Sequence, residues 1–347
     1  MNSIFVSDKI IGESQRTFLI AEVAQAHDGS LGMAHAFIDA ADKAGADAIK
    51  FQTHLADQES TLDEMFRIPF SYEDKNRYDY WKRMEFTESQ WIGLAKHARE
   101  KGLIFLSTPF SVAAVDLLTR LEMPLWKIGS GEINTFSILH AVLNTKKPIL
   151  LSTGMSDYEE ISKTVEQIKL QKVPLVIMQC TSQYPTPLTR VGLNVLHEFR
   201  ERFHCGVGLS DHSGALYAPL AAMAQGAHVI EVHVAFSRDM FGPDTPASLT
   251  FEEFAFLAQA RDAFHVLQTH PVSKDLLAEE LKKTKQLFAK SYAPITALIE
   301  GTVLTESLLV LKKPGTGFTP IDLDKLVGRR LKRAVSPARL LVEEDLE

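Results

Sequence analysis

The 347-residue sequence predicts a TIM (β/α)8 barrel with an N-terminal hairpin, followed by a small β-rich module. Eight short runs rich in β-branched residues alternate with helical segments between residue 17 and about residue 265. Most of these runs are continuously apolar, as parallel strands are when both faces of the sheet are buried. Polar residues end or follow the runs, at the place where such barrels carry their active sites.

The eight predicted strands span residues 17–22, 48–52, 103–108, 125–129, 148–153, 175–180, 206–210 and 229–234. Amphipathic helices lie between them, such as 33–44 and 88–101, and Gly102 supplies a stop signal for the second. An open doubly wound sheet is the alternative fold. It usually has fewer strands and a glycine-rich first turn, and the segment GESQ before the first strand is not a dinucleotide fingerprint.

Two further segments are added to the barrel. Residues 1–12 predict a hairpin of IFV and KII around Ser7 and Asp8, which we expect to plug the bottom of the barrel. Residues 55–90 are too long for an ordinary loop. They predict a lid over the site, a local hydrophobic cluster, or both. Their aromatic side chains are Phe66, Phe70, Tyr72, Tyr78, Tyr80, Trp81 and Phe86.

The pattern of alternating apolar runs and helical segments ends after residue 266. We expect a barrel domain over 1–268, a charged helix or linker over 269–287, and a compact β-rich module over 288–347, where short apolar pieces are separated by Gly and Pro.

Composition excludes several classes of protein. With 45% hydrophobic and 23% charged residues, the chain has the composition of a globular protein with a sizeable core. Its net charge of −7 argues against a general nucleic-acid binder, because no basic excess is present to neutralise phosphates. Cys180 and Cys205 are too few for a disulfide framework, so we expect a reducing, cytoplasmic location. No secretory signal or membrane span is expected.

Charged and hydroxyl side chains that could bind a ligand gather at the ends of the predicted strands. Lys50 and Lys127 lie on predicted strands, and a lysine inside a barrel is costly unless an anion matches it. Hydroxyl groups surround them, which suggests a small, multiply charged ligand such as a phosphorylated carboxylic acid. Two alternatives remain open: a lysine that forms a Schiff base with a carbonyl, or lysines that merely pair with Glu22 or Glu132.

His212 and His233 end neighbouring predicted strands, so their rings can converge on a catalytic metal and leave coordination positions open. The alternative is a pair of hydrogen-bonded polar residues. His27 can ligate the metal or only orient its loop. Asp244 can hold a substrate hydroxyl or a metal-bound water, or simply form a turn after Pro243. We expect Cys180 to be a buried apolar residue rather than a nucleophile.

Eight motifs, one per predicted strand, occur in the order AEVAQAHDGS, KFQTH, LSTPF, WKIGSGEIN, LSTGM, CTSQYPTP, GLSDHS and VIEVH. In this order they resemble the sialic acid synthase family, which includes N-acetylneuraminate, legionaminate and pseudaminate synthases. The C-terminal KKPGTGF, VGRRLKRAV and LVEEDLE look like that family's antifreeze-like, or SAF, domain.

The resemblance implies a metal-assisted condensation of phosphoenolpyruvate with an N-acyl-amino sugar, which yields a nine-carbon 2-keto acid and phosphate. It implies that phosphoenolpyruvate is held by Lys50, Lys127, Ser130, Thr108, Ser152 and Ser210. Ser182 stands where the sialate enzymes usually have Asn. His212 and His233 would bind Mn²⁺ or Mg²⁺, and Glu132 would handle protons. The sugar would face Glu22, Gln52, Tyr184 and Asp244.

The chain departs from the family pattern at two positions. Ala26 replaces the Asn that usually precedes the histidine of the first motif. Lys313 stands where the family often has an Arg that reaches the N-acyl group in the partner subunit's site, and Lys offers a point charge instead of a planar fork. The family's arrangement also implies a domain-swapped homodimer. The competing functions are a Schiff-base aldolase of a keto sugar acid and a catalytically inactive sugar-binding regulatory protein.

Overall fold

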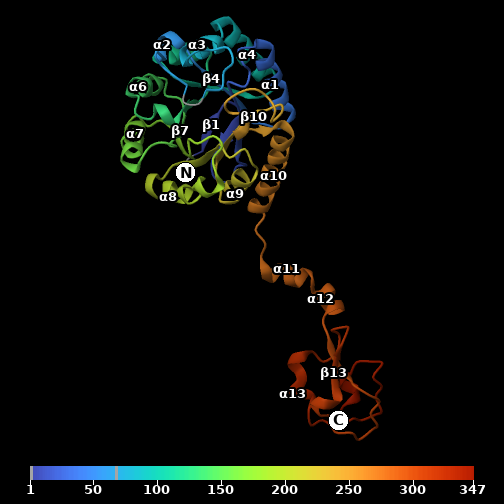
Figure 1. Ribbon diagram of the computed structural model, residues 1–347. Helices are drawn as coiled ribbons and strands as arrows, with labels where there is room; N and C mark the ends of the chain where they lie inside the picture. The colour runs from blue at the N-terminus through green and yellow to red at the C-terminus, as the bar shows by residue number, and fades with distance from the viewer. Residues whose placement is uncertain (1–2, 67–68) are drawn as a thin grey trace. The chain divides into compact units, whose positions relative to one another are not determined.

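The computed structural model describes residues 3–66 and 69–347 and confirms the TIM barrel with its N-terminal hairpin (Figure 1). Eight parallel strands are hydrogen-bonded in the order β5-β4-β3-β10-β9-β8-β7-β6, and each begins and ends within two residues of its predicted bounds. They are β3 (Phe18–Ala24), β4 (Ala48–Thr53), β5 (Ile104–Pro109), β6 (Trp126–Ile128), β7 (Ile149–Ser152), β8 (Leu175–Cys180), β9 (Gly206–Asp211) and β10 (Val229–Ala235).

The barrel is nearly closed. Strands β5 and β6 stand at the two ends of the hydrogen-bonded order and lie side by side. Within the described part of the chain, no backbone hydrogen bond joins them. The Ser107 amide of β5 instead donates to Met123 Sδ at 3.1 Å. The barrel wall therefore has one seam, between two strands that are consecutive in the chain.

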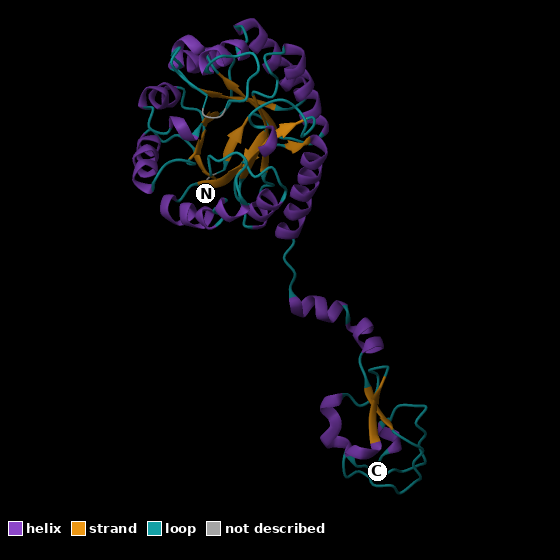
Figure 2. Ribbon diagram, viewed as in Figure 1, coloured by secondary structure: helices purple, strands orange, loops and turns teal. Residues whose placement is uncertain are grey.

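Helices surround the strands, as Figure 2 shows. They are α1 (Leu31–Lys43), α4 (Glu88–Glu100), α5 (Val112–Arg120), α6 (Phe136–Asn144), α7 (Tyr158–Leu170), α8 (Asn194–Phe203), α9 (Tyr217–Ala224) and α10 (Phe251–Thr269). Side-chain caps explain where several begin: Thr87 and Asp157 open α4 and α7 with capping boxes. Each capped helix buries an apolar stripe against the barrel, so the strand ends, not the strand faces, are left for function.

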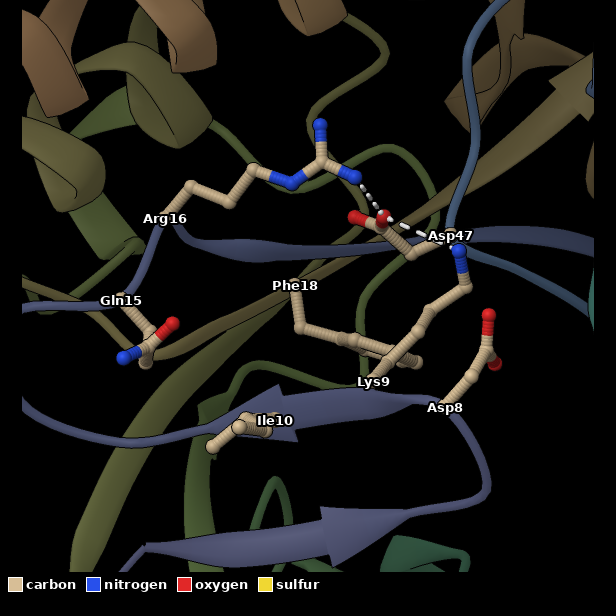
Figure 3. A pocket seen from close by; sticks show the side chains of 7 residues that line it. All are labelled: Asp8, Lys9, Ile10, Gln15, Arg16, Phe18 and Asp47. Atoms are coloured by element: carbon tan, nitrogen blue, oxygen red, sulfur yellow. Dashed lines mark hydrogen bonds and ion pairs between the residues drawn. The ribbon is translucent and has the colours of Figure 1, made fainter.

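The N-terminal hairpin, β1 (Ile4–Val6) and β2 (Lys9–Ile11), buries three of its apolar side chains in the barrel core, as expected of a plug. It lies at the amino ends of the strands, where Asp47 precedes β4. Figure 3 shows Lys9 and Arg16 turned toward Asp47 in a pocket of about 340 Å³. Asp47 also pairs with the buried Arg261 at 2.9 Å and accepts the Leu19 amide. Residues 1–2 of the predicted hairpin segment lie outside the described residues.

The long insertion at 55–90 contains two helices, α2 (Ala56–Glu59) and α3 (Arg77–Met84), and the predicted hydrophobic cluster. Tyr80, Trp81 and Met84 are buried in that cluster, with Phe66 and Phe70 packed against them. The Phe70 ring also lies 5.9 Å from the Phe241 ring, in the loop after β10. The insertion thus reaches across the carboxyl ends of the strands; its residues 67–68 lie outside the described part.

The chain divides into two compact units, Met1–Thr269 and His270–Glu347. The second begins with α11 (Lys274–Glu280) and α12 (Lys282–Phe288), so the predicted charged segment is helical. Its β structure consists of one antiparallel sheet, β12 (Ser291–Pro294) with β13 (Leu309–Lys312), and of isolated bridges. A separate apolar core and the buried Asp345, paired with Arg333 and Arg339, hold it together. Among the described residues, no helix has the length and apolar character needed to cross a bilayer.

Candidate active site

The first lysine is held by the register of neighbouring strands at their carboxyl ends. Lys50 of β4 lies opposite Glu22 of β3, and its Nζ is 2.6 Å from Glu22 Oε2. The same Nζ donates to Thr108 Oγ1 of β5 at 3.1 Å and lies 3.6 Å from Glu231 Oε1. The Lys50 side chain is 2% exposed, so these partners carry the whole cost of burying its charge.

The second lysine corrects an expectation. Lys127 of β6 pairs with Glu231 of β10 at 2.9 Å, whereas the sequence suggested Glu22 or Glu132 as possible partners. Ser210 also donates to Glu231 Oε1, at 3.2 Å. Glu231 was not among the predicted site residues. A signal existed, because it precedes His233 by two residues on one strand and therefore shares its inward face.

The two glutamates differ in protonation. Burial raises the pKa of Glu22 to about 7, with the Glu231 charge adding to the rise and the Lys50 charge opposing it. Burial also acts to raise the pKa of Glu231, but the charges of Lys127 and Lys50 outweigh it and lower that pKa to about 2. Two ammonium groups thus face one firmly ionised carboxylate and one that titrates near neutrality. The cluster has little or no excess of positive charge.

Hydroxyl groups converge beside the lysines around Gly154. The Gly154 amide donates to Ser130 Oγ at 2.9 Å. A Cβ at Gly154 would lie 2.5 Å from Ser182 Oγ, 2.7 Å from Cys180 Sγ and 2.9 Å from Ser130 Oγ. Ser152 Oγ is buried and has no hydrogen-bond partner within the described residues. This arrangement offers several donors to one anionic group and leaves no room for a larger residue.

The two predicted metal ligands and Tyr184 form a second cluster. The His212 and His233 ring centroids are 5.2 Å apart, and the Tyr184 ring lies 4.2 Å from that of His212. His212 Nδ1 faces the Thr181 carbonyl at 3.0 Å, which leaves Nε2 to meet Tyr184 Oη at 3.1 Å. This tautomer presents the Nε2 lone pair toward the site, as a metal ligand must.

His233 provides the second nitrogen. Its Nδ1 is buried with no hydrogen-bond partner in the described chain, and Asp244 Oδ2 lies 3.9 Å away. Burial, followed by the charges of His212 and Lys50, holds the pKa of His233 well below its usual value, so the ring is neutral and able to ligate. No cluster of three or more His, Cys, Asp or Glu suited to a metal occurs among the described residues. A cation here would therefore need ligands from water or substrate.

Gln52 and His54 also belong to the site, beside Glu22, and His54 was not among the predicted site residues. Gln52 Nε2 donates to Glu22 Oε1 at 3.2 Å. Its Oε1 lies 3.2 Å from Nε2 of His54, which is buried between the rings of Trp81 and Phe110. The motif KFQTH contains His54, but its ring partners come from distant segments.

Three other predicted residues form no hydrogen bond or ion pair with Lys50 or Lys127 within the described part of the chain. Glu132, in the short 3-10 turn Ser130–Glu132, is half-buried, and burial raises its pKa, aided by the Glu59 charge. His27 is buried against the Phe86 ring, with an unpartnered Nε2, and does not form a metal-ligand set with other described residues. Lys313 lies in the second unit, with Nζ 5.1 Å from the Phe288 ring centroid; its contact with a partner's site stays a prediction.

Cys180 is buried, as expected, although its surroundings are polar. Its Sγ lies 3.5 Å from Ser130 Oγ and 3.8 Å from His212 Nδ1. Both cysteines are free. The thiol thus forms part of the wall between the hydroxyl cluster and the histidine cluster.

The family comparison covers both units. Residues 37–271 match the model of the NeuB family, and residues 291–347 match that of the SAF domain. The N,N'-diacetyllegionaminic acid synthase of Legionella pneumophila is 32% identical, over 97% of this chain and 96% of its own. The pseudaminic acid synthase of Campylobacter jejuni is 33% identical, over 95% and 97%.

A solved structure has the same fold. It is the N-acetylneuraminic acid (sialic acid) synthetase of Leptospira borgpetersenii in complex with citrate, with a TM-score of 0.72 and 26% sequence identity. The match covers 83% of this chain and 97% of that one.

Proposed function

Since the chain belongs to the NeuB family and carries a SAF domain, we propose that it is a phosphoenolpyruvate-dependent synthase of a nine-carbon 2-keto sugar acid. The second substrate is an N-acyl-amino sugar, such as N-acetylmannosamine, in its open-chain aldehyde form. The relatives' names support this class of product. The observation that carries the proposal is the pair of buried lysines beside converging hydroxyl groups at the strand ends.

Phosphoenolpyruvate is placed on the lysine side of the site. Lys50 and Lys127 stabilise its phosphate and carboxylate. The hydroxyl groups that donate to these anionic groups belong to Thr108, Ser130, Ser152 and Ser182. Ser210, whose proton goes to Glu231 in this structure, would turn to the substrate when it binds. The paired glutamates nearly cancel the lysine charges, so binding a trianion here calls for added positive charge.

A divalent cation, Mn²⁺ or Mg²⁺, fits that need. His212 Nε2 and the unpartnered His233 Nδ1 would hold it, with His212 Nε2 exchanging its contact with the Tyr184 hydroxyl for the cation. When bound, it supplies Lewis-acid polarisation of the sugar aldehyde and part of the missing positive charge. Asp244, 3.9 Å from His233, Tyr184, Glu22 and Gln52 face the sugar in this arrangement.

The site residues take part in successive steps of the proposed reaction. C3 of phosphoenolpyruvate forms the new bond to the aldehyde carbon, and positive charge develops at C2. Water adds at C2 and gives a proton to Glu132, whose raised pKa suits a group that accepts and returns protons. Glu132 returns this proton to the former aldehyde oxygen, which becomes a hydroxyl. The hemiketal phosphate then breaks its C–O bond, its C2 hydroxyl loses a proton to the departing phosphate and becomes the ketone, and Lys50 and Lys127 balance the phosphate charge.

An isotope experiment tests this course. With ¹⁸O at the bridging oxygen of phosphoenolpyruvate, the label should leave with phosphate. Label retained in the keto acid would exclude C–O cleavage. The acceptor is found by screening phosphate release across N-acetylmannosamine, its phosphate and 2,4-diacetamido hexoses; no release with any of them would point to an inactive binding protein.

A Schiff-base aldolase is disfavoured by the lysine partners. Burial lowers the pKa of Lys50, but Glu22 and Glu231 outweigh burial and raise it, whereas imine formation needs a neutral amine. Borohydride should therefore trap no adduct. We further propose a domain-swapped homodimer, in which Lys313 serves the partner's site, and a cytoplasmic location. Sedimentation of the full chain tests the dimer, and activity restored by mixing Lys313 and His233 variants tests the swap.

A further inference from the structure

We propose that His54 is a positioning residue for the sugar side of the site: its Nε2–H holds the Gln52 carbonyl, so that the Gln52 amide nitrogen points at Glu22. The inference rests on the proposed function, in which Gln52 and Glu22 face the acceptor sugar. The reaction course above gives His54 no part.

The His54 ring is fixed by its enclosure. It follows β4 directly and stacks on the Trp81 ring of α3, with centroids 3.7 Å apart and planes within 8°. On its other face the Phe110 ring, after β5, lies at 4.2 Å and 12°. His54 is 6% exposed. Two parallel rings prevent tilting, so the two ring nitrogens keep fixed directions.

The neighbours of the ring decide which nitrogens carry protons. The NH₂ group of the Gln52 amide donates to Glu22 Oε1, an oxygen of the group paired with Lys50. The Gln52 oxygen then faces His54 Nε2 at 3.2 Å, so Nε2 must donate. His54 Nδ1 lies 2.5 Å from Glu59 Oε1 of α2.

Glu59 and His54 together keep that donor in place. Glu59 Oε1 lies against Nδ1 and Gln52 Oε1 lies against Nε2, so each ring nitrogen faces an oxygen that can accept. The ring satisfies both contacts when it donates from both nitrogens. Only loss of the Nε2 proton makes Nε2 an acceptor. Two acceptors would then face each other, and the Gln52 amide would invert and turn its oxygen toward Glu22.

The other charges around His54 are few. Glu64, between α2 and α3, and Arg77, on α3, pair with each other at 2.9 Å. His27, after β3, is neutral, because burial, followed by the His54 and Arg83 charges, lowers its pKa to about 3. Burial lowers the pKa of His54 itself, and the Glu59 hydrogen bond and charge oppose that effect. Glu59 is thus the group that governs the protons of the ring. It comes from the long insertion, as Trp81 does, so the insertion reaches the sugar side through His54.

The test compares two amide substitutions that lose the stacked ring equally. In His54→Gln the side-chain nitrogen takes the place of Nε2 and can still donate to Gln52. In His54→Asn it takes the place of Nδ1, keeps Glu59 and loses Gln52. We expect His54→Asn to raise the KM for the sugar about tenfold, as loss of one positioning hydrogen bond does. His54→Gln should stay within about twofold of wild type, and the KM for phosphoenolpyruvate should be unchanged in both. Equal sugar KM values in the two variants would overturn the proposal.

A further substitution tests the proposal if neither His54→Gln nor His54→Asn folds. In Glu59→Gln the new amide donates to Nδ1, so a neutral His54 keeps its Nε2–H. We expect its sugar KM to stay within about twofold of wild type, whereas Glu59→Ala, which leaves Nδ1 without this partner, should raise it; equal KM values in the two variants would overturn the proposal. An inactive wild type would refute the proposed function alone. Calorimetric binding of N-acetylmannosamine would then decide, with weaker binding to His54→Asn than to His54→Gln supporting positioning and equal binding overturning it.

Discussion

Replacing Gly154 with alanine tests the anion-binding side of the site. The new methyl group would lie 2.5 Å from Ser182 Oγ, 2.7 Å from Cys180 Sγ and 2.9 Å from Ser130 Oγ, far inside the optimum of about 3.5–4.0 Å for non-bonded atoms. Gly154 is not among the glycines with positive φ, so alanine brings no backbone strain. The effect therefore comes from the displacement of these three side chains.

The size of the effect follows from those contacts. Overpacking of this kind costs about 1–3 kcal/mol, which corresponds to a fall in Tm of about 2–12 °C for a domain of this size. If one displaced hydroxyl donates to the phosphate of phosphoenolpyruvate, its loss costs about 1.5–3 kcal/mol and raises the KM for that substrate about 10- to 150-fold. The sugar KM should change little.

A neighbouring glycine provides the control. A Cβ at Gly131 would meet only Met155 Cε, at 3.7 Å, so Gly131→Ala should match wild type. The assays are thermal unfolding and phosphate release, with phosphoenolpyruvate varied at saturating sugar. A wild-type KM in Gly154→Ala, or an equal loss in Gly131→Ala, would refute the assignment of this cluster to the anion.

Three further substitutions have direct expectations. His233→Ala should lower turnover by orders of magnitude while the circular dichroism spectrum is kept, because the substitution removes a proposed metal ligand; near wild-type turnover would exclude the metal assignment. Asp47→Asn removes the carboxylate that faces the buried Arg261 and should cost about 3–5 kcal/mol in urea unfolding, and a loss below about 1 kcal/mol would contradict this. Burial acts to raise the pKa of Asp345, but its hydrogen bonds, led by that from Arg339, outweigh burial and lower that pKa to about 2. This stabilisation, about 2 kcal/mol, is present above the unfolded pKa of about 4 and lost as pH falls from about 4 to 2. Asp345→Asn should remove that acid dependence of unfolding in the second unit.

The eight strands could be predicted because each is a short apolar run, which can be recognised in the sequence without knowledge of tertiary contacts. The pairing of Lys127 could not. Its partner Glu231 lies on β10, which is separated from β6 by three strands in the hydrogen-bonded order, and a sequence gives no distance across a barrel. The period of two along β10 placed Glu231 on the inner face without indicating which lysine it meets.

His54 was missed for a related reason. Its environment is made by Trp81 and Phe110, which join it only when the insertion and the loop after β5 fold over the end of β4. The converse holds for His212 and His233. They end adjacent strands, so chain order alone was enough to predict that their rings meet, and they do.

The seam between β5 and β6 has a consequence for local opening of the barrel. Two strand edges there lack the ladder that protects the rest of the wall, so their amides should exchange with deuterium faster than those of β3 or β9. Thr108 lies at the end of one edge, and Ser130 follows the other. An anion held by both would tie the edges together, and its binding should be visible as slowed exchange along the seam, independent of any turnover.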